Sequence, residues 1–270
     1  GGGGMVGASP EVAFGALAAA LPAAVEYAQR RAGHADPVPW TPAVVAGYCV
    51  LVLGGMELLS FLVNLLFGGW KSIPVRGRHL DELSPKDKAF VAINRLTTLA
   101  FMRAYVIGVA ASCELGPLTL RNTVIALPAL YAVYDLFYSL FHRALHLRAV
   151  YPWVHKHHHR QLAPSRGNTD AVNVHPFEFV MGEYNHLLAV TLVPGVHAVT
   201  AAVFIILGGV LASLNHTRHD VRVEPGVYAV NVHDVHHRVP MSNYGQYTML
   251  WDRVMGTYIP YTEPPAKKKM

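Results

Sequence analysis

The sequence has little charge and very little cysteine. Only 14% of its 270 residues are charged, against ~25% in an average soluble domain, whereas 52% are hydrophobic. This balance excludes a disordered chain and argues against an ordinary soluble enzyme. Two cysteines, Cys49 and Cys113, exclude a disulfide scaffold and a cysteine-rich zinc module. A net charge of +5 gives no case for nucleic-acid binding, and no phosphate loop or Ser-His-Asp arrangement is apparent.

Long apolar runs, by contrast, are present. A helix needs ~20 mainly apolar residues to cross a membrane. Transmembrane helices are therefore predicted over Pro42–Phe67, Leu96–Ser112 and Thr123–Phe141. The run Phe177–Asn215 is broken at Pro194-Gly195 and predicts a hairpin of two short helices. We expect an all-α, multi-pass membrane protein with about three transmembrane helices plus this helical hairpin, capped by a cytosolic, histidine-rich helical domain.

Basic residues are distributed unevenly between these runs. Segments 70–88, 142–186 and 214–270 together hold 17 Lys and Arg, whereas segments 1–41 and 113–122 hold 3. The positive-inside rule places the first set in the cytosol. The hairpin is then required, because it keeps 142–186 and 214–270 on the same side of the membrane.

The most unusual feature is the 16 histidines, of which fourteen lie between His142 and His237. Eleven of them form four clusters, which are His142-Arg-Ala-Leu-His146, His155-Lys-His157-His158-His159, His216-Thr-Arg-His219-Asp220 and His233-Asp-Val-His236-His237. Residues three or four apart share a helix face, so histidines within a cluster point the same way. Imidazole suits iron, zinc and copper. Nine or ten imidazoles match two metal ions with four or five ligands each.

Charged residues inside the apolar runs are also informative. Asp135 forms one helical stripe with Ser139, His142 and His146. Because an acid in a membrane helix is costly and functional by default, Asp135 is predicted to accept the second N–H of a ligand histidine. Glu57 and Arg103, each costly alone, are expected to form an ion pair between the first two helices.

The histidine clusters and the motif Asn243-Tyr-Gly-Gln-Tyr-Thr-Met-Leu-Trp-Asp-Arg253 resemble the fatty acid hydroxylase superfamily. The resemblance covers roughly Tyr131 to Tyr261, and its tail is most similar to sterol C5-desaturases. The family also includes C4-methylsterol oxidases, sphingoid-base hydroxylases and cholesterol 25-hydroxylase. The short interval between His146 and His155 favours this family over desaturases whose first two histidine boxes lie tens of residues apart.

The resemblance implies a membrane enzyme with two iron ions that uses O2 and electrons, commonly from cytochrome b5 and its reductase, to hydroxylate or desaturate a lipid. Zinc could occupy the same sites in a recovered protein. The implied ligands are His142, His146, His155, His158, His159, His216, His233, His236 and His237, with His219 or Asp220 as the tenth. His157 does not fit the ligand spacing. Residues implied to orient the ligands are Asp135, Asn231 and Asn243, together with His175 and Glu178.

Four parts are expected along the chain. They are a lumenal or amphipathic segment (1–41), the first transmembrane helices (42–122), a fatty acid hydroxylase-like catalytic domain (123–261) and a basic cytosolic tail (262–270). The ending Lys267-Lys268-Lys269-Met270 resembles the dilysine retrieval signal of endoplasmic reticulum membrane proteins. We therefore expect that membrane as the location, with the histidines and the C-terminus in the cytosol.

Two other functions stay open. A membrane metal transporter would place histidines along a path inside its helices, whereas these clusters lie at helix ends and in loops. A catalytically inactive scaffold would not need complete clusters. The substrate also stays open among sterols, sphingoid bases, fatty acyl chains and carotenoids, as does the choice between hydroxylation and desaturation.

Overall fold

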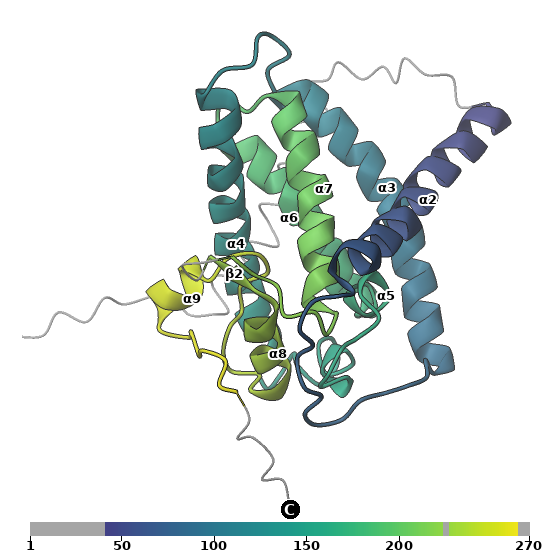
Figure 1. The fold of residues 1–270 in the computed structure, drawn as a ribbon. Helices are drawn as coiled ribbons and strands as arrows, with labels where there is room; N and C mark the ends of the chain where they lie inside the picture. The colour runs from purple at the N-terminus through teal and green to yellow at the C-terminus, as the bar shows by residue number, and fades with distance from the viewer. Residues whose placement is uncertain (1–40, 224–226, 264–270) are drawn as a thin grey trace, which may run out of the picture.

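The computed structural model describes residues 41–223 and 227–263, so the predicted N-terminal segment and basic tail lie almost entirely outside it. Five long helices dominate these residues (Figure 1), namely α2 (Pro42–Phe67), α3 (Pro85–Ser112), α4 (Ala126–Leu145), α6 (Pro176–Leu192) and α7 (Ala198–Asn215). The short elements are a π-helical turn (Arg121–Ile125), a 3-10 turn (His158–Arg160), α5 (Asn168–Ala171), α8 (Val230–Arg238) and α9 (Leu250–Met255). Strands β1 (Arg222–Val223) and β2 (Tyr228–Ala229) form one antiparallel pair.

Four of the described helices are long and apolar enough to cross a membrane. They are α2, α3, α7 and the continuous helix Arg121–Leu145, which joins the π-helical turn to α4. The predicted hairpin is present as α6 and α7, separated by a connection around Pro194-Gly195. The prediction of an all-α, multi-pass membrane protein is therefore confirmed.

The second spanning helix starts earlier than its apolar run suggests. It begins at Pro85 rather than Leu96, because Ser84 and Asp87 form a reciprocal capping box and Pro85 occupies the first turn. Both features favour a helix start. The polar first turns of α3 therefore extend beyond its apolar stretch, toward the histidine-rich end of the molecule.

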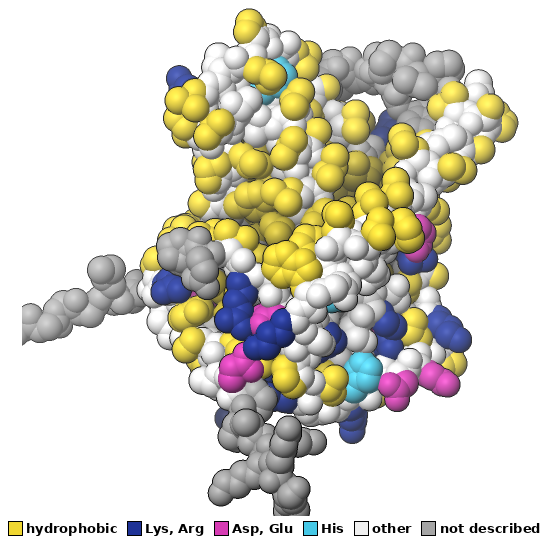
Figure 2. All heavy atoms as spheres, viewed as in Figure 1, with side chains coloured by type: hydrophobic (Ala, Val, Ile, Leu, Met, Phe, Trp, Pro, Cys, Tyr) yellow, Lys and Arg dark blue, Asp and Glu magenta, His cyan; other side chains and the backbone are white. Residues whose placement is uncertain are grey.

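An apolar band covers the visible face of the upper part of the molecule (Figure 2), where hydrophobic side chains gather, while charged side chains collect at the lower end. Large side chains on α2 are strongly exposed, with Leu51 at 74%, Leu65 at 64% and Phe61 at 60%. Exposed apolar area of this extent is unfavourable in water and favourable in hydrocarbon. The band therefore marks the surface that contacts lipid.

The loops between the long helices separate into two ends. At one end, the Glu114 backbone N–H donates to the Val196 carbonyl oxygen (2.8 Å). At the other end, Ile73 N–H donates to Arg218 O (2.7 Å) and Leu162 N–H donates to Arg78 O (2.9 Å). All four histidine clusters thus lie at one end of the bundle, as the hairpin prediction requires.

Glu57 has a different partner from the one predicted. Its carboxylate lies 2.5 Å from the guanidinium of Arg95, not of Arg103. Arg103 lies about two turns further along α3, or ~12 Å at 1.5 Å per residue. The early start of α3 explains the difference, because it brings Arg95 level with the middle of α2.

The core fills the space between α3, α4, α6 and α7. Phe101, Leu130 and Phe204 are fully buried there, and the Asn185 side chain donates to the Tyr134 carbonyl oxygen (2.8 Å), which joins α6 to α4. This packing fixes the helix ends from which the histidines project.

Candidate metal centre

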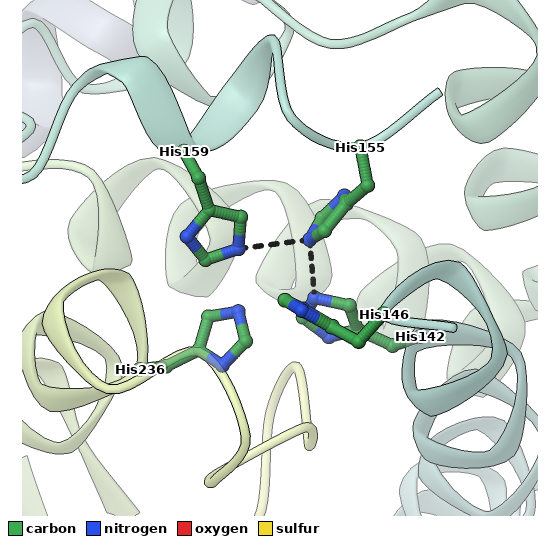
Figure 3. A group of neighbouring side chains, drawn as sticks. All are labelled: His142, His146, His155, His159 and His236. Atoms are coloured by element: carbon green, nitrogen blue, oxygen red, sulfur yellow. Dashed lines mark hydrogen bonds between the residues drawn. The ribbon is translucent and has the colours of Figure 1, made fainter. Parts of the chain in front are cut away.

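Five histidines converge on one point at the polar end of the bundle (Figure 3). They come from the end of α4, the turn that follows it, and α8. One nitrogen from each lies within 4.8 Å of the others. We call this set the first group, and it contains His142, His146, His155, His159 and His236, all buried.

Four further histidines form a second group beside it. Its members are His158, His216, His233 and His237, and their nitrogens also lie within 4.8 Å of one another. Rings of the two groups are in contact, with the centroids of His158 and His159 5.8 Å apart. The structure thus brings nine of the ten predicted ligand histidines into two adjacent buried sets.

Local helical geometry explains which histidine joins which group. In α8, His233 and His237 are four residues apart and share a face, so both enter the second group, while His236 points to the first. The turn before residue 160 divides in the same way, since His155 and His159 enter the first group. Each of the two clusters with the spacing His-x-x-His-His therefore contributes histidines to both groups.

Hydrogen bonds fix which nitrogen of each ring faces the centre of the first group. The Nδ1 atoms of His142 and His236 lie 2.9 Å and 2.6 Å from the carbonyl oxygens of Tyr244 and Ser242. A carbonyl oxygen only accepts, so each Nδ1 carries the proton. The lone pair of each neutral ring is then on Nε2. In His236 that Nε2 is buried and has no hydrogen-bond partner among the described residues.

His155 completes this arrangement. Its Nδ1 lies 2.8 Å from the Glu178 carboxylate in an ion-pair contact that is not aligned as a hydrogen bond, and the carboxylate charge favours a proton on Nδ1 and a lone pair on Nε2. That Nε2 lies 3.0 Å from the Nε2 of His142. Two lone pairs facing each other at this distance repel, and a cation between them removes the repulsion.

The second group repeats the pattern. His216 Nδ1 lies 2.8 Å from the Ala212 carbonyl oxygen, so its Nε2 offers a lone pair. This Nε2 lies 3.3 Å from the Nε2 atoms of both His158 and His233. Burial lowers the pKa of His233 and His237 well below the ordinary value, which keeps the imidazoles in the neutral form that metals bind.

These distances fit metal coordination. Two nitrogens bound ~2.1 Å from one ion lie roughly 3.0 to 3.4 Å apart in right-angled or tetrahedral geometry. The Nε2 contacts within the groups range from 2.9 Å between His155 and His159 to 3.3 Å between His216 and His233. Each group can therefore hold one ion through nitrogen ligands, the donor set that suits iron, zinc or copper.

His219 does not join either group. It was expected one helical turn beyond His216 on the same face, but α7 ends at Asn215. The chain then pairs with Ser72, and the His219 ring faces Asn64 instead, with Nε2 3.5 Å from its side-chain oxygen. Asp220 binds the Arg222 guanidinium through both carboxylate oxygens. Neither candidate for the tenth ligand is positioned to bind a metal held by these groups.

Three further predicted residues, His157, His175 and Glu178, have different roles. His157 faces Asp87 and Asn173, away from both groups. His175 caps the start of α6 by accepting from the Phe177 N–H (3.2 Å). Glu178, three residues on, contacts His155 as described.

Asp135 acts on a loop rather than on a histidine. Its fully buried carboxylate accepts the backbone N–H groups of Gln246, Tyr247 and Thr248 at 3.1, 3.1 and 2.5 Å. The prediction that it holds a ligand imidazole is wrong, because the 246–248 backbone occupies the space beside it. Its influence on the histidines passes through this loop.

The same loop reveals residues that the histidine pattern did not single out. Ser242 and Tyr244 orient His236 and His142 through their carbonyl oxygens, which no side-chain motif reveals. Asp252, also fully buried, accepts the N–H groups of Tyr244 (2.7 Å) and Gly245 (2.8 Å). The Asn-Tyr-Gly-Gln-Tyr motif is therefore a strap of backbone carbonyls held between two buried carboxylates.

The two predicted asparagines differ in their roles. Asn243 has a left-handed backbone (φ 54°) and its amide bridges Val232 and Ile259 through their backbone groups. It thus fixes the strap between its two histidine contacts. Asn231 is buried in the first turn of α8, and no hydrogen bond among the described residues joins its side chain to a histidine.

A pair of substitutions separates the two histidines of the third cluster. His216→Ala is expected to weaken binding at the second group by more than ~100-fold, since losing even an outer partner of a ligand costs 10–100-fold. His219→Ala is expected to change it by less than threefold, roughly the spread of a surface substitution. Metal content of the purified proteins measures both. Loss of metal in His219→Ala alone would contradict this assignment.

The sequence was compared with protein families and with known proteins. Residues 127–257 match the family described as fatty acid hydroxylase. The chain is 33% identical over 136 residues to the Delta(7)-sterol 5(6)-desaturase of Eremothecium gossypii, covering 50% of this chain and 38% of that protein. It is 26% identical over 140 residues to methylsterol monooxygenase 1 of Rattus norvegicus, covering 50% of this chain and 47% of that protein. No solved structure matches.

Fold and site together define a multi-pass membrane protein whose helix ends carry two buried histidine groups. Residues 127–257 match the fatty acid hydroxylase family, and the chain is similar to sterol desaturases over about half of its length. The chain aligns with less than half the length of these two relatives. Nine of the histidines and the whole carbonyl strap fall inside the matched residues.

Proposed function

We propose that this protein is a membrane-bound, O2-dependent oxidoreductase that hydroxylates or desaturates a lipid and holds two iron ions in its histidine groups. The observation that carries the proposal is the pair of adjacent all-nitrogen groups whose lone pairs converge at the ends of membrane helices. Sterol desaturases and methylsterol monooxygenases among the relatives support this reaction class.

The protein's own contribution is to hold and shield the metals. Iron ions in the two groups would supply the O2 activation that no amino-acid side chain provides. The five histidines of the first group and the four of the second bind the metal ions. Glu178 and the carbonyl strap orient the ligand histidines, and the buried surroundings exclude water. His155 and His236 are both fully buried, which protects a reactive site from side reactions with solvent.

The substrate we propose is a lipid taken from the bilayer. The first group includes His142 and His146 at the end of α4, which belongs to a helix long and apolar enough to span the membrane. A sterol is the substrate class that the relatives favour, ahead of sphingoid and fatty acyl lipids. Cytochrome b5 with its reductase is the proposed electron donor, and the endoplasmic reticulum the proposed membrane.

A metal transporter fits the arrangement less well. Transport needs ligands along a path across the membrane, whereas both groups lie at one end of the bundle. An inactive scaffold would not need two groups with converging lone pairs.

The test of the function uses purified full-length chain in lipid nanodiscs with ferrous iron, O2 and a chemical reductant. Sterol, sphingoid and fatty acyl substrates are supplied separately, and products are analysed by mass spectrometry. Gain of one oxygen indicates hydroxylation, and loss of two hydrogens indicates desaturation. His236→Ala serves as the negative control. Metal-loaded protein that converts none of the three classes would contradict the proposal.

The proposed orientation is tested separately, by accessibility. Tags near residues 80 and 165 are expected to be labelled from the cytosolic side of sealed vesicles, because both lie at the basic, histidine-bearing end. A tag near residue 118, at the opposite end, is expected to be labelled only after permeabilisation. Labelling of 80 and 165 from opposite sides would contradict a single site.

A further inference from the structure

His157 is the one histidine of the second cluster that joins neither metal group, and its side chain is nevertheless only 6% exposed. A buried imidazole needs hydrogen-bond partners. One of its two polar partners, Asp87, comes from a part of the chain that precedes the residues matched by the family.

Asp87, in the first turn of α3, provides a charged contact. The His157 Nε2 lies 3.0 Å from Asp87 Oδ1 and 3.0 Å from the side-chain oxygen of Asn173. Both oxygens accept, so His157 Nε2 carries a proton, which it donates to Asn173 while the Asp87 carboxylate lies beside it. The Phe90 ring, one turn further along α3, meets the His157 ring edge-on at 4.7 Å between centroids. These contacts fix both the position and the orientation of the His157 ring.

Asp87 is itself held firmly. Its Oδ2 accepts from the Ser84 backbone N–H (2.7 Å) and from the Ser84 hydroxyl (2.5 Å). Its Oδ1 also accepts from the Asn173 amide (3.1 Å) and faces the Arg160 guanidinium at 3.4 Å. The residue is 3% exposed. A carboxylate with this many donors makes a rigid anchor for His157.

The position of His157 in the chain makes the anchor important. It lies between His155, which enters the first group, and His158, which enters the second. Fixing one ring of this turn fixes the backbone from which ligands of both groups project. We propose that Asp87 is a positioning residue that, through His157, sets how tightly both histidine groups hold their metal ions. The inference rests on the proposed metal-binding function.

Two substitutions break the contact from opposite sides. Asp87→Asn replaces the charged acceptor with an amide that cannot accept at both oxygen positions, and His157→Leu removes the donor. Each is expected to release metal 10–100-fold faster, the usual cost of losing an outer partner of a metal ligand. His157→Gln, whose amide N–H can donate to Asp87, is expected to restore most of the retention.

The measurement is zinc or cobalt(II) release to a chelator from the full-length protein in detergent. The cobalt(II) visible spectrum reports ligand geometry, and thermal unfolding of the metal-free protein confirms that each variant folds. Ser84→Ala is the matched control, because it removes the hydroxyl that caps α3 and bonds Asp87 Oδ2. The Asp87 Oδ1 that faces His157 keeps its contacts with Asn173 and Arg160, and Oδ2 keeps the Ser84 backbone N–H. This variant is expected to lower thermal stability without faster release.

The outcomes separate this inference from the proposed function. Wild-type release rates in both Asp87→Asn and His157→Leu would show that Asp87 is only a helix cap and would overturn the inference. Equal acceleration in Ser84→Ala would overturn it as well, since helix capping would then explain the effect. A wild-type chain that binds neither zinc, cobalt nor iron would overturn the proposed function, and the inference with it.

Discussion

Replacement of His155 or His236 with alanine is expected to abolish lipid oxidation and to lower metal affinity by more than ~100-fold, above the cost of losing an outer partner. Both side chains are fully buried. Each substitution removes one nitrogen ligand of the first group, so that only four nitrogens remain to bind the metal ion. Metal content per chain and turnover of the substrate identified by mass spectrometry are measured together.

The matched control is His197→Ala. This histidine is also buried, but it caps α7 at the opposite end of the bundle and contacts the Gly116 carbonyl oxygen. It is expected to keep its metal while losing about 1 kcal/mol of stability, as expected for a lost cap. Full metal occupancy in both His155→Ala and His236→Ala would exclude the first group as a metal site.

Asp135→Ala is expected to destabilise the folded protein by about 3–9 kcal/mol. It leaves three backbone N–H groups of the strap without their acceptor, and each unsatisfied buried group costs roughly 1–3 kcal/mol. Metal affinity of the first group is expected to fall by 10–100-fold, because the strap carbonyls orient His142 and His236. Unfolding in mild denaturant and chelator competition measure the two effects.

Asp135→Asn tests the mechanism of this loss. Its remaining side-chain oxygen can accept from part of the strap, so stability and metal affinity are both expected to lie between those of wild type and Asp135→Ala. Asp81→Ala, whose carboxylate is 89% exposed, controls for the loss of one negative charge. Wild-type metal affinity in Asp135→Ala would show that the strap does not orient the ligands.

The features that the sequence predicts well are those carried by local periodicity. Apolar runs identify the spanning helices, and the i, i+4 spacing of His142 and His146 places both at one helix end. The two clusters with the spacing His-x-x-His-His supply six of the nine histidines in the two groups, and the hairpin keeps both clusters on one side of the membrane. These properties depend on residues close together in the chain.

The features it predicts poorly depend on partners far apart in the chain. Asp135 and its loop are separated by more than a hundred residues, and the choice between backbone N–H groups and an imidazole is made by packing alone. The Glu57 partner depended on where α3 begins, which a capping box decided. The exclusion of His219 depended on where α7 ends, and nothing in its histidine spacing marks that point.

Helix α8 supplies ligands to both groups, His236 to one and His233 and His237 to the other. During synthesis the chain emerges from its N-terminus, so the histidines of α4 and of the following turn are made first. Neither group is complete until α8 has been made. A chain arrested before residue 233 carries four of the five histidines of the first group but only two of the four of the second, so the proposed loading of the second group depends most on α8.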